Sequence, residues 1–369
     1  MSKTTTFWMA FLLMISASCN NLNKNFFTKK TPKEIYKDVL KKKDPLLLTA
    51  WDLAGKYALE HPLIITDSYA EYGLTKAGTA DANAFQISLK PGQQIIANYD
   101  MDSLSMPAFL EIWKQDINGM VLLASADSIS KTAQYFSLDG ADYIVKFQPK
   151  IEVIANYNLI IQVAAGLEYP IDQKAKSSIG SLWGDPRDGG LRKHEGIDIF
   201  AAKGSKIIAA ADGVITNVGE TEIGGKVVSL QPKGQYLSIY HAHLDEQLVQ
   251  YGQTVTKGQV IGTVGNTGNA ITTAPHLHLG IYTRNGAVDP LLFVKKIPIV
   301  KPMPPKKLQQ QLKFSSTALL YPSPNVKNPM TVTKGFIAVT EGYTNGFYRV
   351  KLDDGIKGFV KEADYKRAK

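Results

Sequence analysis

The stretch APHLHLG, residues 274–280, places two histidines two positions apart in an otherwise small and apolar run. Side chains separated by two positions in a strand point to the same face of the sheet. We therefore expect His276 and His278 to face one site, with Leu277 directed into a core on the opposite side. The spacing leaves three possibilities open: two metal ligands, two structural residues, or a division of labour.

Two further clusters lie close by, so that five of the six histidines fall between residues 194 and 278. His194 and Asp198 stand four apart in KHEGIDIF, and an extended segment would bring them to one side. His241 and His243 stand two apart in SIYHAHLD, so we expect them to share a face, as a metal pair or as one inward histidine with a tolerated neighbour. Three protein ligands with an open position are the pattern of catalytic zinc, which binds imidazole nitrogen and carboxylate oxygen.

Residues 178–293 resemble the M23 peptidases, the LytM and lysostaphin-like zinc endopeptidases of bacterial cell walls. The landmarks that carry the resemblance, in chain order, are SLWG (181–184), HEGIDIFAAKGSKIIAAADGVI (194–215), YHAHL (240–244), YGQTVTKGQVIGTVGNTGNA (251–270), PHLHLGI (275–281) and VDPLLF (288–293). The resemblance implies an antiparallel β domain that carries one Zn²⁺ per chain.

The resemblance also divides the roles among these residues. Carried over position by position, it implies three zinc ligands, His194, Asp198 and His278, and two catalytic residues, His243 and His276. His241 stands where the family often has a small or unrelated residue, so we expect it to be non-catalytic. The departures from the family pattern, Ala274 and the pair Leu279-Gly280, fall on none of these positions.

The amino terminus has the layout of a secretory signal over residues 1–18. A positive charge precedes the apolar run FWMAFLLMI, which is too short to span a bilayer, and small residues follow it. The chain's one cysteine, Cys19, comes next, and ISASCN resembles the lipobox of bacterial lipoproteins, although Ser16 stands where an aliphatic residue is usual. We expect an exported protein anchored in a membrane through lipidated Cys19 and facing the cell envelope, in the periplasm or at the cell surface; plain secretion is the alternative.

The remaining chain reads as a mainly β, multidomain protein. Thr31-Pro32 and Asp44-Pro45 predict the starts of two short helices within about 32–60. Phe85, Ile87 and Leu89 alternate with polar residues, which predicts strands and a small sandwich. The expected order is a tether (19–31), helices with a β-rich domain of unknown role (32–167), the M23-like domain (168–296), a Pro/Lys-rich semi-rigid linker (297–311) and a carboxy-terminal domain (312–369).

The carboxy-terminal domain resembles bacterial SH3 domains. ALLYPSPN (318–325) and KGFIAVTEGYTNGFYRVKLDDGIKGFVKEADY (334–365) carry this resemblance, with Phe347 where tryptophan is usual. It implies a small barrel that binds peptidoglycan peptides. Tyr343 and Phe347 are expected to be core residues, and His61, at a helix end, to be structural.

The net charge of +9 suits nucleic acid, an anionic membrane or a wall polymer, and the export signal favours the wall. We therefore expect a zinc-dependent endopeptidase that cuts peptide cross-links of peptidoglycan, with no nucleic acid and no clear protein partner. The alternatives are a non-catalytic wall-binding or hydrolase-activating scaffold and a peptidase for another extracellular peptide. Because the five predicted site residues are all present, the non-catalytic class is the less favoured.

Overall fold

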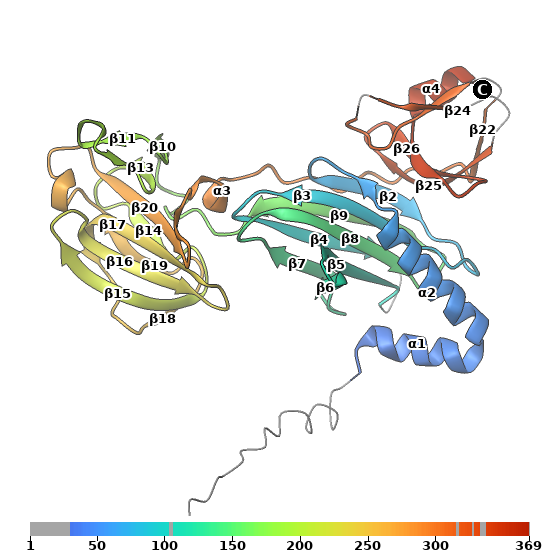
Figure 1. The fold of residues 1–369 in the computed structure, drawn as a ribbon, viewed down its shortest axis with the longest axis horizontal. Coiled ribbons are helices and arrows are strands. Elements are labelled where there is room, and N and C mark those ends of the chain that lie inside the picture. The colour runs from blue at the N-terminus through green and yellow to red at the C-terminus, as the bar shows by residue number, and fades with distance from the viewer. Residues whose placement is uncertain (1–29, 103–105, 315–316, 327, 333–336, 369) are drawn as a thin grey trace, which may run out of the picture. The chain divides into compact units, whose positions relative to one another are not determined.

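The computed structural model describes residues 30–102, 106–314, 317–326, 328–332 and 337–368 (Figure 1). The predicted signal, Cys19 and nearly all of the tether lie outside the described residues. The chain divides into two compact units, Met1–Leu48 and Thr49–Lys369. In the part of the chain that the structure describes, no helix combines the length and the apolar character needed to cross a membrane.

The two predicted helices are confirmed as α1 (Pro32–Lys43) and α2 (Pro45–Glu60). Thr31 and Glu34 form a capping box at the start of α1, each side chain bonding to the other residue's backbone N–H. The Asp44 carboxylate accepts a bond from the Leu46 N–H at 2.9 Å. The side chain before each proline thus caps the helix that follows, as the sequence predicts.

The β-rich block is a sandwich of two sheets around one core. Its first sheet runs in the order β1 (Leu63–Ile64), β3 (Asn83–Leu89), β8 (Ala141–Pro149), β5 (Ala108–Asp116) and β6 (Gly119–Ser125). Its second contains β2 (Tyr69–Leu74), β9 (Asn156–Ala165), β4 (Gln93–Met101) and β7 (Thr132–Phe136). Phe85, Ile87 and Leu89 are buried in the shared core, which confirms the alternation in β3.

The second sheet continues into carboxy-terminal strands. These are β25 (Ile337–Thr344), β26 (Phe347–Leu352) and β27 (Lys357–Lys361), with β22 (Gln311–Lys313) also on β25; β23 (Ala318–Leu320) pairs with β24 (Met330–Val332), and α4 (Glu362–Ala368) follows β27. Tyr343 on β25 is paired with Tyr72 on β2. The turn between β25 and β26 is an Asn-Gly turn, with positive φ at Asn345 and Gly346. The SH3-like assignment stays a prediction.

Buried ion pairs join these strands to the sandwich. The Arg349 guanidinium on β26 is fully buried and donates from Nε and Nη2 to both carboxylate oxygens of Glu71 on β2, at 2.5 and 2.9 Å. It also bonds to Asn83, Tyr157 and Glu341. The carboxy-terminal strands therefore belong to the same packed body as the sandwich.

The Pro/Lys-rich segment 297–311 contacts the rest of the chain at Pro298, Val300 and Lys306. The Gln162 side chain accepts a bond from the Val300 N–H at 2.7 Å and donates to the Pro298 carbonyl at 3.1 Å. The Lys306 ammonium lies 3.6 Å from the ring centre of Tyr343. These contacts fix both ends of the segment, in addition to the stiffness expected of its prolines.

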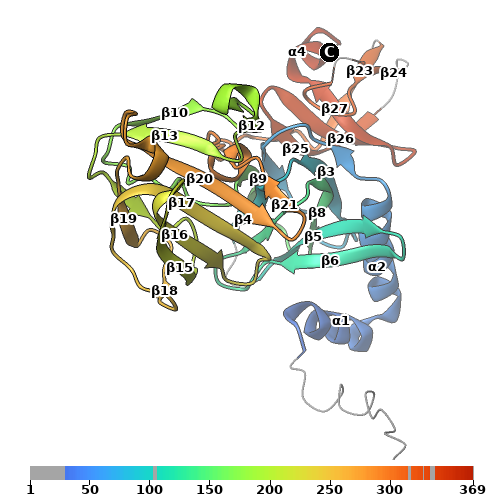
Figure 2. The same cartoon turned by 60° about the vertical axis from the view of Figure 1, so that its left-hand side comes forward.

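Residues 168–296 form an antiparallel sheet of their own (Figure 2). Its main path is β10 (Ser177–Ser181), β13 (Ile197–Ala201), β20 (His276–Thr283), β17 (Leu237–Gln247), β16 (Gly225–Pro232), β15 (Gly213–Thr221) and β18 (Thr254–Val255). Beside it lie β14 (Lys206–Ile208), β19 (Val260–Val264) and β21 (Gly286–Val288); the hairpin β11 (Pro186–Arg187) and β12 (Arg192–Lys193) with η1 (Asp188–Gly190), η2 (Gly268–Ala270) and α3 (Leu291–Val294) complete the block. Leu277 is fully buried in its core, as predicted.

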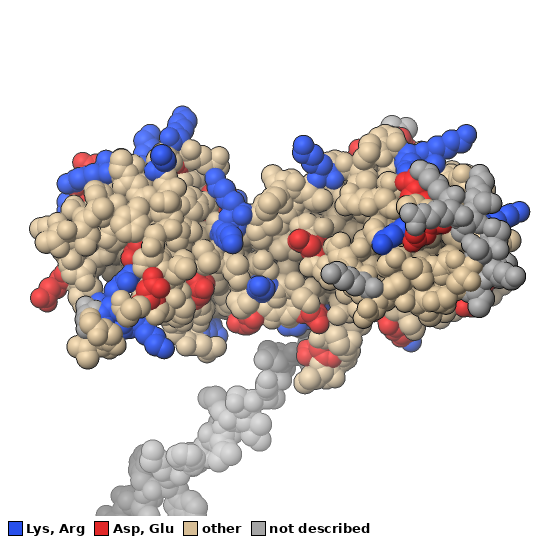
Figure 3. All heavy atoms as spheres, turned by 90° about the horizontal axis from the view of Figure 1, so that it is seen from above, with Lys and Arg blue, Asp and Glu red and all other residues tan. Residues whose placement is uncertain are grey.

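The charged side chains are dispersed on the face shown in Figure 3. Lysine and arginine form small separate groups there, with aspartate and glutamate between them. The basic side chains on this face are therefore spread over the surface and form no single broad patch.

Candidate active site

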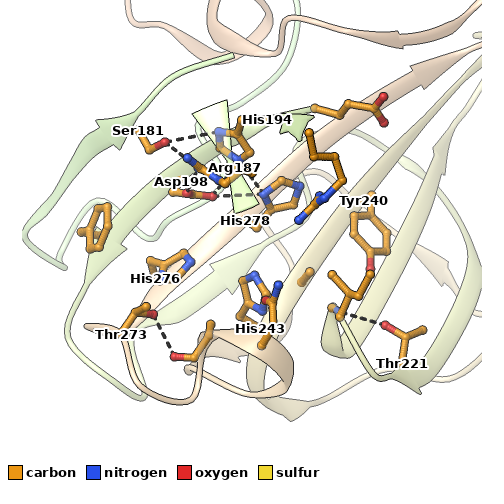
Figure 4. A pocket seen from close by; sticks show the side chains of 18 of the residues that line it. Ser181, Arg187, His194, Asp198, Thr221, Tyr240, His243, Thr273, His276 and His278 are labelled. Carbon is orange, nitrogen blue, oxygen red and sulfur yellow. Dashed lines mark hydrogen bonds and ion pairs between the residues drawn. The ribbon is translucent and has the colours of Figure 1, made fainter. Parts of the chain in front are cut away.

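A cleft of about 540 Å³ opens on the sheet of residues 168–296 (Figure 4). Its walls come from β10, β13, β17 and β20 and from the loops that follow β15 and β19. The five residues predicted as ligands or catalysts all line it: His194, Asp198, His243, His276 and His278. The fold thus brings together side chains from three separate sequence clusters.

Three of these residues form a compact donor set. Asp198 on β13 and His278 on β20 are direct cross-strand partners, and His194 lies in the turn just before β13. His194 Nε2 lies 2.9 Å from His278 Nδ1, and Asp198 Oδ1 lies 3.0 Å from each of these nitrogens. Two imidazole nitrogens and one carboxylate oxygen at these separations suit an ion bound at about 2.0–2.2 Å, as zinc is.

Hydrogen bonds and charges around the donor set suit His194 and Asp198 to bind a metal ion. His194 Nδ1 donates to the Leu182 carbonyl at 2.9 Å, which leaves the lone pair on Nε2. Burial raises the pKa of Asp198, but the adjacent imidazoles of His194 and His278 outweigh it and hold this pKa far below the ordinary value. The carboxylate is therefore ionised, as a metal ligand must be.

Gly196 explains how the set fits together. A Cβ at this position would lie 2.6 Å from Cε1 and 2.8 Å from Nε2 of the His278 ring. The absence of a side chain at Gly196 therefore leaves the space in which the ring of the third donor packs.

His243 and His276 lie beside the donor set with a common orientation. His243 Nδ1 donates to the Thr267 carbonyl at 2.9 Å, and His276 Nδ1 donates to the Ala274 carbonyl at 2.8 Å. In its neutral form each imidazole therefore carries its lone pair on Nε2, and the two ring centres are 5.0 Å apart. Burial lowers the pKa of His243 to about 4, so this imidazole is neutral at pH 7.

The expectation that His241 and His243 share a face is wrong. His243 has φ of 63°, a left-handed conformation, and its N–H bonds to the Gly224 carbonyl at 2.7 Å. The strand alternation breaks there, so Ala242 and His243 both line the cleft. His241 is fully buried on the other side and donates from Nδ1 to the Val228 carbonyl. This position supports the prediction that His241 takes no part in catalysis.

Behind Asp198 lies a group of polar residues that the sequence did not indicate as part of the site. Arg187 on β11 donates from Nη2 to Asp198 Oδ2 at 2.8 Å and to Ser181 Oγ at 2.7 Å. Ser181 in turn donates to the Asp185 carboxylate at 3.0 Å. No periodic spacing marks these residues; the SLWG landmark was the one signal that drew attention to their segment.

This part of the chain is similar in sequence to known proteins. The model of peptidase family M23 matches residues 192–290. The peptidoglycan DD-endopeptidase ShyC of Vibrio cholerae is 36% identical over 115 residues, covering 31% of this chain and 26% of its own length. The murein hydrolase activator NlpD of Escherichia coli is 39% identical over 102 residues, covering 27% and 26%. The solved catalytic domain of lysostaphin from Staphylococcus simulans is 30% identical, covering 33% of this chain and 94% of that domain, with a TM-score of 0.30.

The chain spans only about a quarter of the length of these two curated relatives, so the likeness concerns one domain. Within it, the matched residues contain the whole donor set and both neighbouring histidines. M23 peptidases are metallopeptidases, and the relatives include both peptidoglycan endopeptidases and a murein hydrolase activator. Residues 192–290 therefore form a domain of peptidase family M23.

Proposed function

We propose that this protein is a zinc-dependent endopeptidase that hydrolyses peptide cross-links of bacterial peptidoglycan, with water as the nucleophile. The observation that carries the proposal is the meeting of a three-atom donor set and two further imidazoles in one cleft. His194, Asp198 and His278 would hold the ion, one per chain. When bound, zinc polarises a scissile carbonyl and makes an attacking water more acidic.

His243 and His276 would handle the protons. In the neutral form of each, the lone pair lies on Nε2, because a backbone carbonyl holds the Nδ1–H. A neutral imidazole can accept the proton of the attacking water, and once protonated it can donate to the oxyanion of the tetrahedral intermediate. Burial favours the neutral form of His243, which suits it to accept a proton at pH 7.

The proposed substrate and location rest on several supports. ShyC is named as a peptidoglycan DD-endopeptidase, and a net charge of +9 suits an anionic wall polymer. We further propose that Cys19 is lipidated, that the protein is anchored by it in the cell envelope, and that residues 312–369 are an SH3-like module that binds wall peptides. The resemblance of ISASCN to a lipobox supports the anchor.

A second candidate function is that of a hydrolase activator without activity of its own. NlpD, named as a murein hydrolase activator, is 39% identical in the matched region. Against this candidate stands the complete set of ligand-type and catalytic-type residues, since a scaffold needs no such set.

Digestion of purified sacculi tests the proposal. The mature chain, loaded with zinc, is incubated with sacculi, and the released peptides are identified by mass spectrometry. Cleaved cross-links are expected, and chelation or the His276→Ala change should abolish them. The chain would instead be an activator if it cleaved nothing alone, but the wild type and the His276→Ala variant both increased release by a partner amidase.

A further inference from the structure

The segment SLWGDPR, residues 181–187, wraps the outer side of the donor set, and the proposed function gives it no role. Its turn is closed by the Asp185 carboxylate, which accepts from the Leu182 N–H at 2.8 Å and from the Ser181 hydroxyl at 3.0 Å. Main-chain bonds tie this turn to the first donor: His194 N–H to the Asp185 carbonyl and Gly184 N–H to the His194 carbonyl, both at 2.9 Å. The turn thereby places the Leu182 carbonyl opposite His194 Nδ1.

Arg187 extends the same support to the second donor. Its Nη2 lies 2.8 Å from Asp198 Oδ2, while the other oxygen, Oδ1, faces the nitrogens of His194 and His278. The same Nη2 also bonds to Ser181 Oγ at 2.7 Å. The contact is well shielded, because the side chains of Arg187 and Asp198 are 28% and 11% exposed. Figure 4 shows Arg187 and Ser181 on the outer side of Asp198, away from His243.

We propose that Arg187, held by Ser181, is a positioning residue for the metal site: it fixes the Asp198 carboxylate so that Oδ1 alone is offered to the ion. The proposal rests on the proposed zinc site. Bonds to the oxygen that does not bind the metal fix the rotation of a ligating carboxylate, and loss of such bonds costs about 10- to 100-fold in affinity or activity.

Charge alone predicts the opposite effect. A guanidinium next to the donor set repels a divalent cation, so that removing it would tighten metal binding if repulsion were the larger effect. The geometry favours the orienting role, because Arg187 bonds to Oδ2 and thereby leaves Oδ1 free for the ion. The sign of the change in affinity therefore distinguishes the two roles.

The test measures zinc affinity by competition with a chromophoric chelator. It uses the full mature chain and the variants Arg187→Ala, Arg187→Lys and Ser181→Ala. Lys193→Ala is the control, since it removes an exposed cation from the strand paired with β11. Arg187→Ala should weaken zinc binding by about 10- to 100-fold, and Ser181→Ala should weaken it less. Arg187→Lys should recover most of the loss, because an ammonium can also donate to both acceptors.

A cobalt-substituted sample adds a spectroscopic readout. The visible absorption of Co²⁺ reports ligand geometry, so Arg187→Ala should change the band shape and Lys193→Ala should not. Thermal unfolding of the metal-free proteins shows whether each variant is folded. If Arg187→Ala is not folded, Arg187→Lys replaces it as the test variant.

Unchanged or tighter zinc binding in folded Arg187→Ala would overturn the proposal. Because affinity is measured without any substrate, a wild-type chain that binds zinc but leaves sacculi intact would refute the proposed function and leave this inference standing. A wild-type chain without zinc affinity would refute both.

Discussion

His194 Nε2 and His278 Nδ1 lie 2.9 Å apart, although 84 positions separate the two residues in the chain. The contact exists because β20, which carries His278, is paired with β13, and β13 begins directly after the turn that carries His194. His276, two positions before His278, lies in the same cleft. Its Nδ1 donates to the Ala274 carbonyl, so its Nε2 lies on the opposite side of the ring. One strand therefore supplies both a donor to the proposed metal site and an imidazole outside it.

Substitution of the two histidines on β20 should separate binding from turnover. His278→Ala removes one of three donors and should weaken zinc affinity by more than the roughly 10- to 100-fold expected for an outer contact. His276→Ala should leave zinc affinity near that of the wild type and reduce turnover by about 100- to 10,000-fold, since it removes a proton-handling group. Chelator competition and sacculus digestion measure the two quantities. Equal loss of zinc in both variants would refute the division of roles.

Gly196→Ala should damage the proposed metal centre without replacing any of its ligand residues. The new methyl group would lie 2.6 Å from Cε1 of His278 and 2.6 Å from the Leu279 carbonyl, so the ring must shift. We expect zinc affinity to fall by about 10- to 100-fold, as for a misplaced donor. Gly219→Ala in the same sheet is the matched control, because the nearest heavy atom to its Cβ would be 3.7 Å away. Similar affinities for the two variants would show that the His278 ring adapts.

The five site residues predicted from the sequence line one cleft, but part of their geometry could not be predicted from it. The capping side chains of Thr31 and Asp44 and the buried position of Leu277 follow from local rules, and the structure confirms all three. The left-handed backbone of His243 could not be foreseen, because no glycine or asparagine marks it. It depends instead on the Gly224 carbonyl in the turn between β15 and β16.

The pairing of strands that lie far apart in the chain was a second feature that the sequence could not predict. Nothing in the local pattern of β25 indicates that it pairs with β2, nor that Arg349 meets Glu71 across 278 positions. An arginine in a strand pattern reads as a surface residue, whereas this one is fully buried. Likewise Arg187 is ordinary in sequence and gains its place from the β11–β12 hairpin. Contacts of this kind are specified by the whole fold.

Loss of Arg349 should destabilise the second sheet. Arg349→Met leaves the Glu71 carboxylate buried without its main partner, which costs about 3–5 kcal/mol when one member of a buried pair is removed. Lys351→Met on the same strand changes an exposed cation and should shift the free energy of unfolding by less than about 0.5 kcal/mol. Urea titration followed by tryptophan fluorescence measures both. Equal stability of the two variants would mean that the buried network contributes nothing net.

The buried His241 should make stability depend on pH. Burial lowers its folded-state pKa to about 4, and its Nε2 has no hydrogen-bond partner among the described residues. The unfolded chain takes up this proton near pH 6.5, whereas the folded chain resists it down to about pH 4. The stabilising contribution is therefore complete above about pH 6.5 and is lost as the pH falls towards 4, by at most about 3 kcal/mol.

His241→Leu tests this assignment, because leucine keeps an apolar side chain in the same core and cannot titrate. Urea unfolding of the metal-free proteins at several pH values from 7.5 to about 4.5 should show a smaller fall in the free energy of unfolding for the variant. His243 has a lowered pKa of about 4 for the same reason and is present in both proteins, so part of the fall should persist. Parallel curves for the two proteins would place the pH dependence elsewhere in the chain.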